Sequence, residues 1–547
     1  MDRFSCVRSA QIPKPFAARK LLPVLLIALA FLLLQPLAAR AGTVSPGATL
    51  KRWETSELVL VASNAYTNAY TDVEVTAQFS GPAGAAFTVH GFWDGGNTFK
   101  VRFTPTVEGN WTYTVSSSPE DSGLTAAGSF TVVAADAANS GFLRRDPANP
   151  SSFVFDDGRR HFMWGQTYYE IIKNAMAGNK WQTSIANSKA RGMNKVRMLV
   201  YPWPTARSDN RYPDTEPFLA GDHNRLNLPH WQKLDEVVQY LGSQGMIADL
   251  IIFTDADRTY GFPVQDERYL RYVIARYAAY HNVIWCLTNE WNYTGKPQEY
   301  WDNIGAIVRA EDPWMAQGAF LRPLSIHQKT GPAFEYMGST WPVHAIVQFG
   351  VRNATYAYGD AWGNYSIVNN LGRGLPVVND EYGYIGETSP INLTQTQHRN
   401  AIWGIAVAGG YGAAGDTRNA SGSIAYLSAG WKDASEYTDI KTMVGFWTTR
   451  GIEYWKMTSQ NSIVLSGTRV YALANPGSEY VIYAAKGGSF KISLPQGNVT
   501  YKVLRFNPRD GTQVFLPNIA GGGTPTLQMP DTNDWIVWIY NSTLPRS

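Results

Sequence analysis

Cysteine is scarce in this chain of 547 residues, which contains only two, Cys6 and Cys286. Cys6 lies in an amino-terminal segment with the features of an export signal, so removal of that segment would leave Cys286 alone. A mature chain with one cysteine forms no internal disulfide. Because Cys286 lies within an apolar run typical of a strand, we expect it to be a buried packing residue.

The chain also has little net charge. Lys and Arg number 47 and Asp and Glu number 44, which leaves a formal net charge of +3. No run of Lys and Arg occurs beyond the amino-terminal segment. Nucleic acid and anionic membrane surfaces are therefore not expected partners.

Several short motifs of metal and nucleophile chemistry are missing. Neither His-Glu-x-x-His nor Cys-x-x-Cys occurs, and the adjacent Asp222 and His223 lack a metal-ligand pattern. We therefore expect no metal site and no cofactor. No Gly-x-Ser-x-Gly motif occurs either, so an esterase of that type is unsupported.

Long apolar runs are limited to one, from Leu21 to Leu34. It follows basic residues such as Arg19 and Lys20, and the small-x-small sequence Ala39-Arg-Ala41 comes after it. This pattern predicts a cleaved signal peptide over residues 1–41 and a secreted protein, extracellular or periplasmic. An uncleaved anchor is the weaker alternative, because the run is short for a bilayer, which needs about 20 residues.

Aromatic residues, in contrast, are abundant, with 19 Trp and 30 Tyr. Most are expected in the core, but the excess suits a cleft that stacks flat rings on sugars. The length favours two to four domains.

Two regions of the chain have an all-β pattern. Residues 42–135 alternate with period two in segments such as Glu57–Ala62, with turns at Gly81-Pro82 and Gly95-Gly96, which predicts an immunoglobulin-like β-sandwich. Short strands such as Thr500–Phe506 predict a second sandwich over residues 462–547.

Between them, residues 141–457 alternate strands and helices, which predicts a (β/α)8 barrel. Helices are expected at Trp231–Ser243 and Glu267–Tyr280. The eight expected strands are His161–Thr167, Lys195–Tyr201, Met246–Phe253, Val283–Thr288, Leu324–His327, Ala345–Phe349, Pro376–Asn379 and Gly410–Ala414.

Two of these strands are followed closely by glutamates, Glu290 and Glu381. The segment between them is long enough for three βα units of about 30 residues each, so they fall on the fourth and seventh strands. Residues at the carboxyl ends of barrel strands face the active site. Two carboxylates held about 5–5.5 Å apart are the catalytic pair of a retaining glycosidase.

Retention requires one protonated and one ionised carboxyl group, and the spacing alone does not assign the roles. Asn289 could donate a hydrogen bond to a sugar hydroxyl. Arg197 is a charge inside an apolar strand and needs an anionic partner, for which we name Glu381, since a nearby cation keeps a carboxylate ionised. A purely structural ion pair is the alternative for Arg197.

Other candidates lie near the predicted strand ends. His327 is either a site residue or a hydrogen-bonded core histidine, and Asp255 contacts substrate or caps a turn. Asp380 should point to the opposite face from Glu381 and serve a structural role. Four aromatic residues are expected to stack on sugar or to fill the core, Trp164, Tyr168, Trp203 and Trp291.

Four motifs give the chain a resemblance to a known family, Val154-Phe-Asp-Asp-Gly-Arg-Arg-His-Phe-Met-Trp-Gly165, Trp285-Cys-Leu-Thr-Asn-Glu290, Val378-Asn-Asp-Glu381 and Phe506-Asn-Pro-Arg509. They resemble the apiosidase-like (DUF4038-type) hydrolases of the clan A retaining glycosidases. The three-part layout is similar too, with a DUF5060-like sandwich before the barrel and a collagen-binding-type sandwich after it. The resemblance implies that Glu290 is the acid/base and Glu381 the nucleophile.

These observations favour a secreted retaining glycoside hydrolase that acts on a plant or microbial polysaccharide. The resemblance directs the substrate towards furanosides such as apiosyl or arabinofuranosyl groups. An endo-acting β-glycanase or a transglycosylase is the alternative on the same site. A non-catalytic carbohydrate-binding or adhesion protein is the alternative of another class.

Overall fold

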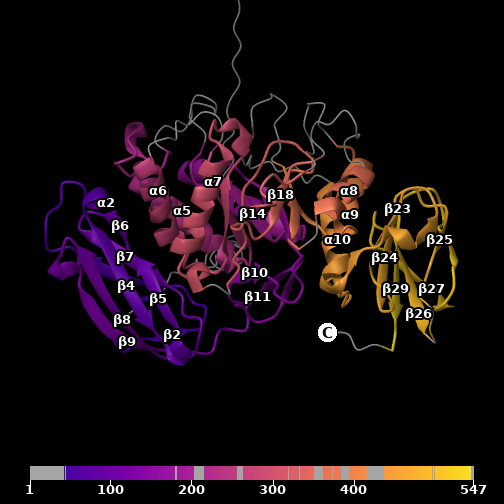
Figure 1. Ribbon diagram of the computed structural model, residues 1–547, viewed down its shortest axis with the longest axis horizontal. Helices are drawn as coiled ribbons and strands as arrows, with labels where there is room; N and C mark the ends of the chain where they lie inside the picture. Colours follow the sequence, from indigo (N-terminus) through magenta and orange to yellow (C-terminus); the bar gives the residue numbers. More distant parts are fainter. Residues whose placement is uncertain are drawn as a thin grey trace, which may run out of the picture. The chain divides into compact units, whose positions relative to one another are not determined.

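The computed structural model describes residues 42–43, 45–178, 181–202, 215–254, 263–317, 320–331, 333–349, 361–371, 374–383, 393–415, 436–495, 497 and 499–543. Residues Ala41–Ser547 form one compact unit, drawn from indigo to yellow in Figure 1. The predicted signal segment, residues 1–41, lies outside the described residues. Within the described ranges no helix has both the length and the apolar character that crossing a bilayer requires.

The centre of this unit is an eight-stranded parallel sheet, in the order β17-β16-β15-β14-β13-β20-β19-β18. Every residue in these strands is buried, which explains why most of them are apolar. Their bounds are β13 Trp164–Thr167, β14 Lys195–Leu199, β15 Ile247–Phe253, β16 Val283–Thr288, β17 Leu324–Ser325, β18 Ala345–Val347, β19 Val377–Asn379 and β20 Tyr411–Ala414.

The sheet curves into a nearly closed barrel. Its outermost strands, β17 and β18, approach each other where Val343 N–H donates to Leu324 O at 2.8 Å. All eight expected barrel strands are present, and the predicted fold class is confirmed. The first is shorter than expected, because Arg160–His161 (β12) pairs instead with Phe153–Phe155 (β11) and through it with Leu143–Arg145 (β10).

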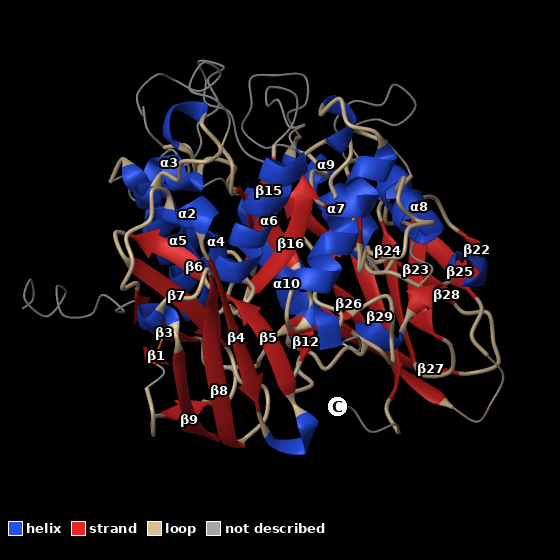
Figure 2. Cartoon of the chain, turned by 60° about the vertical axis from the view of Figure 1, so that its left-hand side comes forward, coloured by secondary structure: helices blue, strands red, loops and turns tan. Residues whose placement is uncertain are grey.

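Helices surround the barrel. Figure 2 shows them in blue beside the red barrel strands, and α5 and α7 pack on β15 and β16. Their bounds are α3 Ile171–Met176, α4 Trp181–Ala190, α5 Leu228–Ser243, α6 Pro263–Tyr277, α7 Gln298–Glu311, α8 Ala361–Leu371, α9 Gln395–Ala406 and α10 Glu436–Thr448.

The amino-terminal region forms the expected sandwich of two sheets, in the orders β1-β3-β7-β6 and β2-β9-β8-β4-β5. Aromatic side chains such as Phe79 and Phe103, with stacked rings 3.9 Å apart, fill the space between them. The element bounds are β1 Gly42–Thr43, β2 Thr49–Lys51, β3 Ser56–Val61, α2 Ala69–Asp72, β4 Glu74–Ser80, β5 Ala86–His90, β6 Phe92–Gly95, β7 Thr98–Phe103, β8 Gly109–Ser118 and β9 Ala126–Val133.

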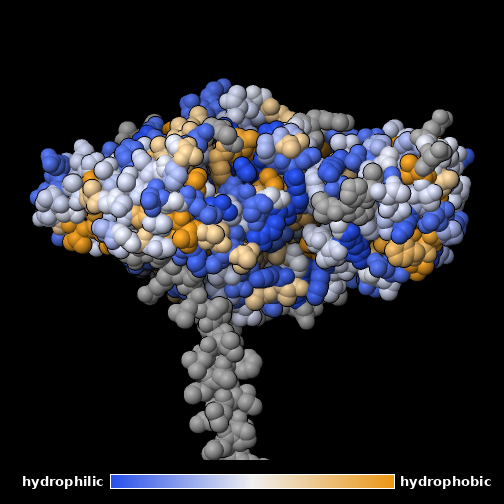
Figure 3. All heavy atoms as spheres, turned by 90° about the horizontal axis from the view of Figure 1, so that it is seen from below, coloured by the Kyte–Doolittle hydropathy of each residue, from blue (hydrophilic) through white to orange (hydrophobic). Residues whose placement is uncertain are grey.

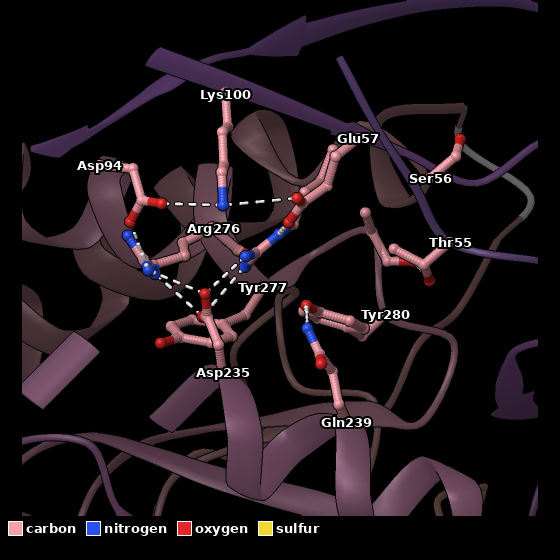
Figure 4. A network of polar contacts seen from close by, with 12 residues as sticks. Thr55, Ser56, Glu57, Asp94, Lys100, Asp235, Gln239, Arg276, Tyr277 and Tyr280 are labelled. Atoms are coloured by element: carbon pink, nitrogen blue, oxygen red, sulfur yellow. Dashed lines mark hydrogen bonds and ion pairs between the residues drawn. The ribbon is translucent and has the colours of Figure 1, made fainter. Parts of the chain in front are cut away.

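This sandwich and the barrel share one hydrophobic core. Trp314, from the segment after α7, lies 6.1 Å from the ring of Phe103, and its Nε1 donates to Thr104 O at 3.1 Å. Beside this contact is a network of charged groups from both domains (Figure 4). Arg102 on β7 and Arg276 on α6 both donate to the buried Asp235 on α5. Apolar packing and ion pairs therefore join the two domains.

The carboxyl-terminal region forms a second sandwich, with a six-stranded sheet β21-β23-β24-β29-β26-β27 and a three-stranded sheet β22-β25-β28. Arg399 of α9 donates to Asp534 at 3.0 Å, and the Tyr483 hydroxyl donates to Asn400 at 2.8 Å, so this sandwich also contacts the barrel helices. The strands are β21 Thr458–Ser459, β22 Val464–Ser466, β23 Val470–Asn475, β24 Glu479–Ala484, β25 Ser489–Ile492, β26 Thr500–Phe506, β27 Gln513–Ala520, β28 Thr526–Gln528 and β29 Trp535–Asn541.

The surface shows apolar side chains in separate groups. On the face seen in Figure 3, hydrophilic residues gather over the middle, with smaller hydrophobic groups towards the two ends. Exposed large apolar residues include Val59 and Val61 on β3 and Val514 and Phe515 on β27. Both strands belong to the sandwiches and not to the barrel.

Candidate active site

Four barrel strands bring the candidate catalytic residues together at their carboxyl ends. Arg197 lies within β14, Tyr169 follows β13, Asn289 follows β16 and Glu381 follows β19. These residues are far apart in sequence, and the parallel order of the sheet places their strand ends at the same edge.

Arg197 is the centre of this group and is fully buried. Its NH2 donates to Asn289 Oδ1 at 2.7 Å, and its NH1 donates to the Tyr169 hydroxyl at 2.9 Å. NH1 also lies 3.4 Å from Glu381 Oε1, so the expected ion pair between Arg197 and Glu381 is present. One guanidinium therefore contacts three strand ends.

Glu381 has hydrogen-bond donors on both carboxylate oxygens and is only 3% exposed. The Tyr169 hydroxyl donates to Oε1, and Gln348 Nε2, from the residue after β18, donates to Oε2 at 2.6 Å. Donors and a cation favour the charged form of a carboxylate. The surroundings of Glu381 thus suit an ionised group in a fixed orientation.

Glu290 has a different environment. It is half-buried and has a left-handed backbone, with φ 39° and ψ 59°, immediately before the 3-10 turn Trp291–Tyr293. Its backbone N–H donates to His327 Nδ1 at 3.4 Å, and Trp291 N–H donates to His327 O at 2.9 Å. The two glutamates therefore differ in burial and in backbone conformation.

His327 is fully buried beside this backbone. Burial, and then the charges of Arg197 and Lys195, lower the pKa of its imidazole well below the usual value. The ring is therefore neutral at physiological pH, and Nδ1 is available as an acceptor for the Glu290 N–H.

Beneath Arg197 lies a second charged cluster inside the barrel. Lys195 Nζ donates to Asp380 Oδ1 at 2.6 Å and to Asp249 Oδ2 at 3.0 Å, and all three side chains are fully buried. Lys195 and Arg197 are two residues apart on β14 and so share one face. Asp380 contacts one and Glu381 the other, so the expectation that Asp380 points away from Glu381 is wrong. Strand β19 ends at Asn379, and the alternation does not continue beyond it.

Two of the four aromatic candidates, for which the sequence allows either stacking on sugar or packing in the core, lie in the packed interior. Trp164 is fully buried, with its ring 6.3 Å from that of Phe162 and its Nε1 donating to the Tyr382 hydroxyl at 3.4 Å. The buried Tyr168 hydroxyl bonds to Ser188 on α4 at 2.7 Å. The Tyr168 N–H donates to the Arg197 carbonyl oxygen at 2.8 Å, but the hydroxyl that contacts the Arg197 guanidinium is that of Tyr169.

Of the three remaining candidates, the structure describes only Trp291. Trp291 is half-buried next to Glu290, and its ring packs edge-on against Tyr336 at 5.3 Å. Trp203 and Asp255 lie outside the described residues.

Sequence reasoning did not identify Tyr169 and Gln348, because each follows the end of a short strand and no periodicity marks it. Lys195 and Asp249 did leave a signal, since each is a charge inside an apolar strand, as Arg197 is. In the described part of the chain, no group of three or more His, Cys, Asp or Glu side chains is placed to hold a metal ion.

Solved structures with this fold include named glycoside hydrolases. A candidate glycoside hydrolase from Bacteroides vulgatus has 23% identity and a TM-score of 0.74, over 90% of this chain and 100% of that one. A family 5 glycoside hydrolase from the same organism has 16% identity and a TM-score of 0.57, over 74% of this chain and 95% of that one. These similarities establish the shared fold.

Family comparison identifies the parts of the chain. Residues 49–118 match a domain of unknown function, DUF5060, and residues 148–417 match the family described as "Apiosidase-like, catalytic domain". The barrel is therefore similar to the apiosidase-like catalytic domains over residues 148–417. No curated protein matches the chain.

Proposed function

We propose that this protein is a secreted retaining glycoside hydrolase in which Glu290 is the general acid/base and Glu381 is the nucleophile. The apiosidase-like catalytic domain and the barrel fold support the glycosidase activity itself. The retaining mechanism, the substrate and the secretion are further parts of the proposal.

The contacts of Arg197 are the observation that carries this assignment. Through Asn289 and Glu381, this one cation joins the strand ends that hold the two glutamates. A nucleophile must stay ionised, and Glu381 has a cation and two neutral donors on its carboxylate. An acid/base must exchange protons with water, and Glu290 is the more exposed of the pair.

The reaction then proceeds in two displacements. Glu381 attacks the anomeric carbon while Glu290 protonates the leaving oxygen, which gives a covalent glycosyl-enzyme. Glu290, now a base, takes a proton from water, and the water oxygen attacks the same carbon and releases Glu381. An acceptor sugar in place of water would give transglycosylation.

For the substrate we propose a plant or microbial polysaccharide carrying apiosyl or arabinofuranosyl groups, which the family match supports. An endo-acting β-glycanase is the alternative on the same site. Aryl furanosides and aryl pyranosides, tested beside intact polysaccharides, distinguish the two by which compounds release product.

Azide rescue tests the roles of the glutamates. Glu381→Ala should abolish turnover. Azide should restore activity of this variant on an activated aryl substrate and give a glycosyl azide of inverted configuration. Glu290→Ala should yield a retained azide product instead. Exchanged stereochemistry would reverse the two roles, and rescue of neither variant would refute double displacement at this site.

Two further measurements test the remaining parts. A ligand-free crystal structure should place the two carboxyl groups about 5–5.5 Å apart, whereas a separation near 9 Å would indicate inversion. Amino-terminal sequencing of the exported protein should begin at Gly42. Binding of polysaccharide without any turnover on the whole panel would favour a carbohydrate-binding or adhesion protein.

A further inference from the structure

Lys195 occupies an unusual position in the barrel interior, two residues before Arg197 on β14. Its ammonium group has carboxylates on two sides, Asp380 Oδ1 at 2.6 Å and Asp249 Oδ2 at 3.0 Å. Burial alone would lower the pKa of Lys195, but the charges of Asp380 and Asp249 outweigh it and raise that pKa. Lys195 is therefore a buried cation that touches neither Glu381 nor Asn289 in the described structure.

Asp380 and Glu381 are neighbours in sequence, and both lie near Arg197. Glu381 Oε1 is 3.4 Å from Arg197 NH1, and Asp380 Oδ2 is 3.9 Å from Arg197 Nε. Among the described residues neither Arg197 Nε nor Asp380 Oδ2 has a hydrogen bond. These two atoms would need to approach by only a fraction of an ångström to form one.

The position of Arg197 is therefore a balance between two carboxylates. In a buried site, an unpaired anion and an unpaired cation attract strongly. Asp380 stays at 3.9 Å from Arg197 while its other oxygen is bound by Lys195. Asp249 lies farther from that ammonium group than Asp380 does, at 3.0 Å against 2.6 Å.

We propose that Lys195 is a positioning residue for the proposed reaction: by holding Asp380, it leaves the Arg197 guanidinium to Asn289 and Glu381. This inference rests on the proposed function for its catalytic consequence but not for its structural one. Without Lys195, Asp380 pairs with Arg197 Nε, and the guanidinium turns away from the two strand ends that it now connects.

The test compares Lys195→Met with the double variant Lys195→Met/Asp380→Asn. In the single variant, a crystal structure should show Arg197 Nε hydrogen-bonded to Asp380 and the contact with Asn289 lost. Because a misplacement of about 1 Å can reduce a rate 100-fold, loss of the Asn289 contact should reduce kcat by up to about 100-fold with a smaller change in KM. The double variant removes the competing anion, so it should restore both the Arg197 contacts and most of the activity.

Two outcomes would overturn the proposal. Arg197 unmoved in the single variant would mean that Lys195 does not position it. A double variant no more active than the single one, with both folded, would mean that Lys195 does not act by holding Asp380. If Lys195→Met does not fold, Asp380→Asn alone still tests the proposal, because loss of the Arg197 contacts in that variant would overturn it. The crystal structures need no substrate, so they test Lys195 independently of the proposed activity.

Discussion

Replacing Arg102 with Met tests how firmly the amino-terminal sandwich is attached to the barrel. The Arg102 guanidinium donates to both Asp235 oxygens, at 3.0 and 2.5 Å, and to Glu57 Oε1 at 2.7 Å. Removing one partner of a buried ion pair destabilises a protein by about 3–5 kcal/mol, because the other charge stays buried. Arg276 still neutralises Asp235 in this variant, so we expect the lower end, about 3 kcal/mol of unfolding free energy.

Lys100→Met is the matched control. Lys100 contacts the same network, with Asp94 at 2.8 Å and Glu57 at 3.4 Å, but from its more exposed side. A surface ion pair contributes about 0–1 kcal/mol. Urea denaturation at pH 7, followed by tryptophan fluorescence, should therefore give a much lower midpoint for Arg102→Met than for Lys100→Met.

The double variant Arg102→Met/Asp235→Asn tests whether the unpaired charge of Asp235 causes the loss of stability. If the uncompensated Asp235 charge causes the loss, the double variant should be less destabilised than the sum of the two single variants. Equal stability of Arg102→Met and Lys100→Met would refute the idea that these buried charges attach the sandwich to the barrel.

Three further predictions concern the site and the barrel interior. Arg197→Met should lower kcat/KM and move its acidic limb to higher pH, because a cation beside a carboxylate favours the charged form of that carboxylate. Tyr169→Phe removes a donor to Glu381 and should reduce kcat by about 10- to 100-fold, measured with the same substrate. Burial lowers the pKa of both His161 and His344 to about 3. In the unfolded chain a histidine has a pKa of about 6.5, so these imidazoles bind a proton there before they do in the folded protein. Lowering the pH from about 6.5 to about 3 therefore favours unfolding, by about 2 kcal/mol per histidine at pH 5.

Each of these has a clear contrary result. An unchanged acidic limb in Arg197→Met, with activity lost only by unfolding, would make that residue purely structural. A Tyr169→Phe variant with wild-type kcat would mean that the hydroxyl does not assist the nucleophile. For the histidines, His344→Phe should reduce the slope of stability against pH in urea titrations between pH 7 and 5, and an unchanged slope would contradict neutral burial.

The fold could be predicted because each barrel strand is buried on both faces. An apolar run such as Ile247–Phe253 has this property at every position, so it is recognisable without knowledge of its neighbours. The residues just after a strand are less predictable, because side chains stop alternating between the two faces where the hydrogen bonds of the sheet end. For this reason the sequence indicates Tyr168 as a candidate but not Tyr169, and it predicts the wrong face for Asp380.

Contacts between domains could not be predicted at all. Asp235 appears in the sequence as one polar position on an amphipathic helix, and its partner Arg102 is 133 residues away in another domain. Nothing in either local pattern specifies the other residue. The core of the site was accessible only where an unusual residue interrupts a regular pattern, as Arg197 and the two glutamates do.

The left-handed backbone of Glu290 has a consequence for capturing complexes with intact oligosaccharides. A non-glycine residue in this conformation is strained by about 1–2 kcal/mol. Glu290→Gly relieves that strain, partly offset by the greater freedom of glycine in the unfolded chain, so its melting temperature should equal or exceed that of the native protein. At Glu381 the opposite holds, because Tyr169, Arg197 and Gln348 would all lose their shared acceptor. Of the two inactive forms, the Glu290 variant is therefore the better trap for soaking and cocrystallisation.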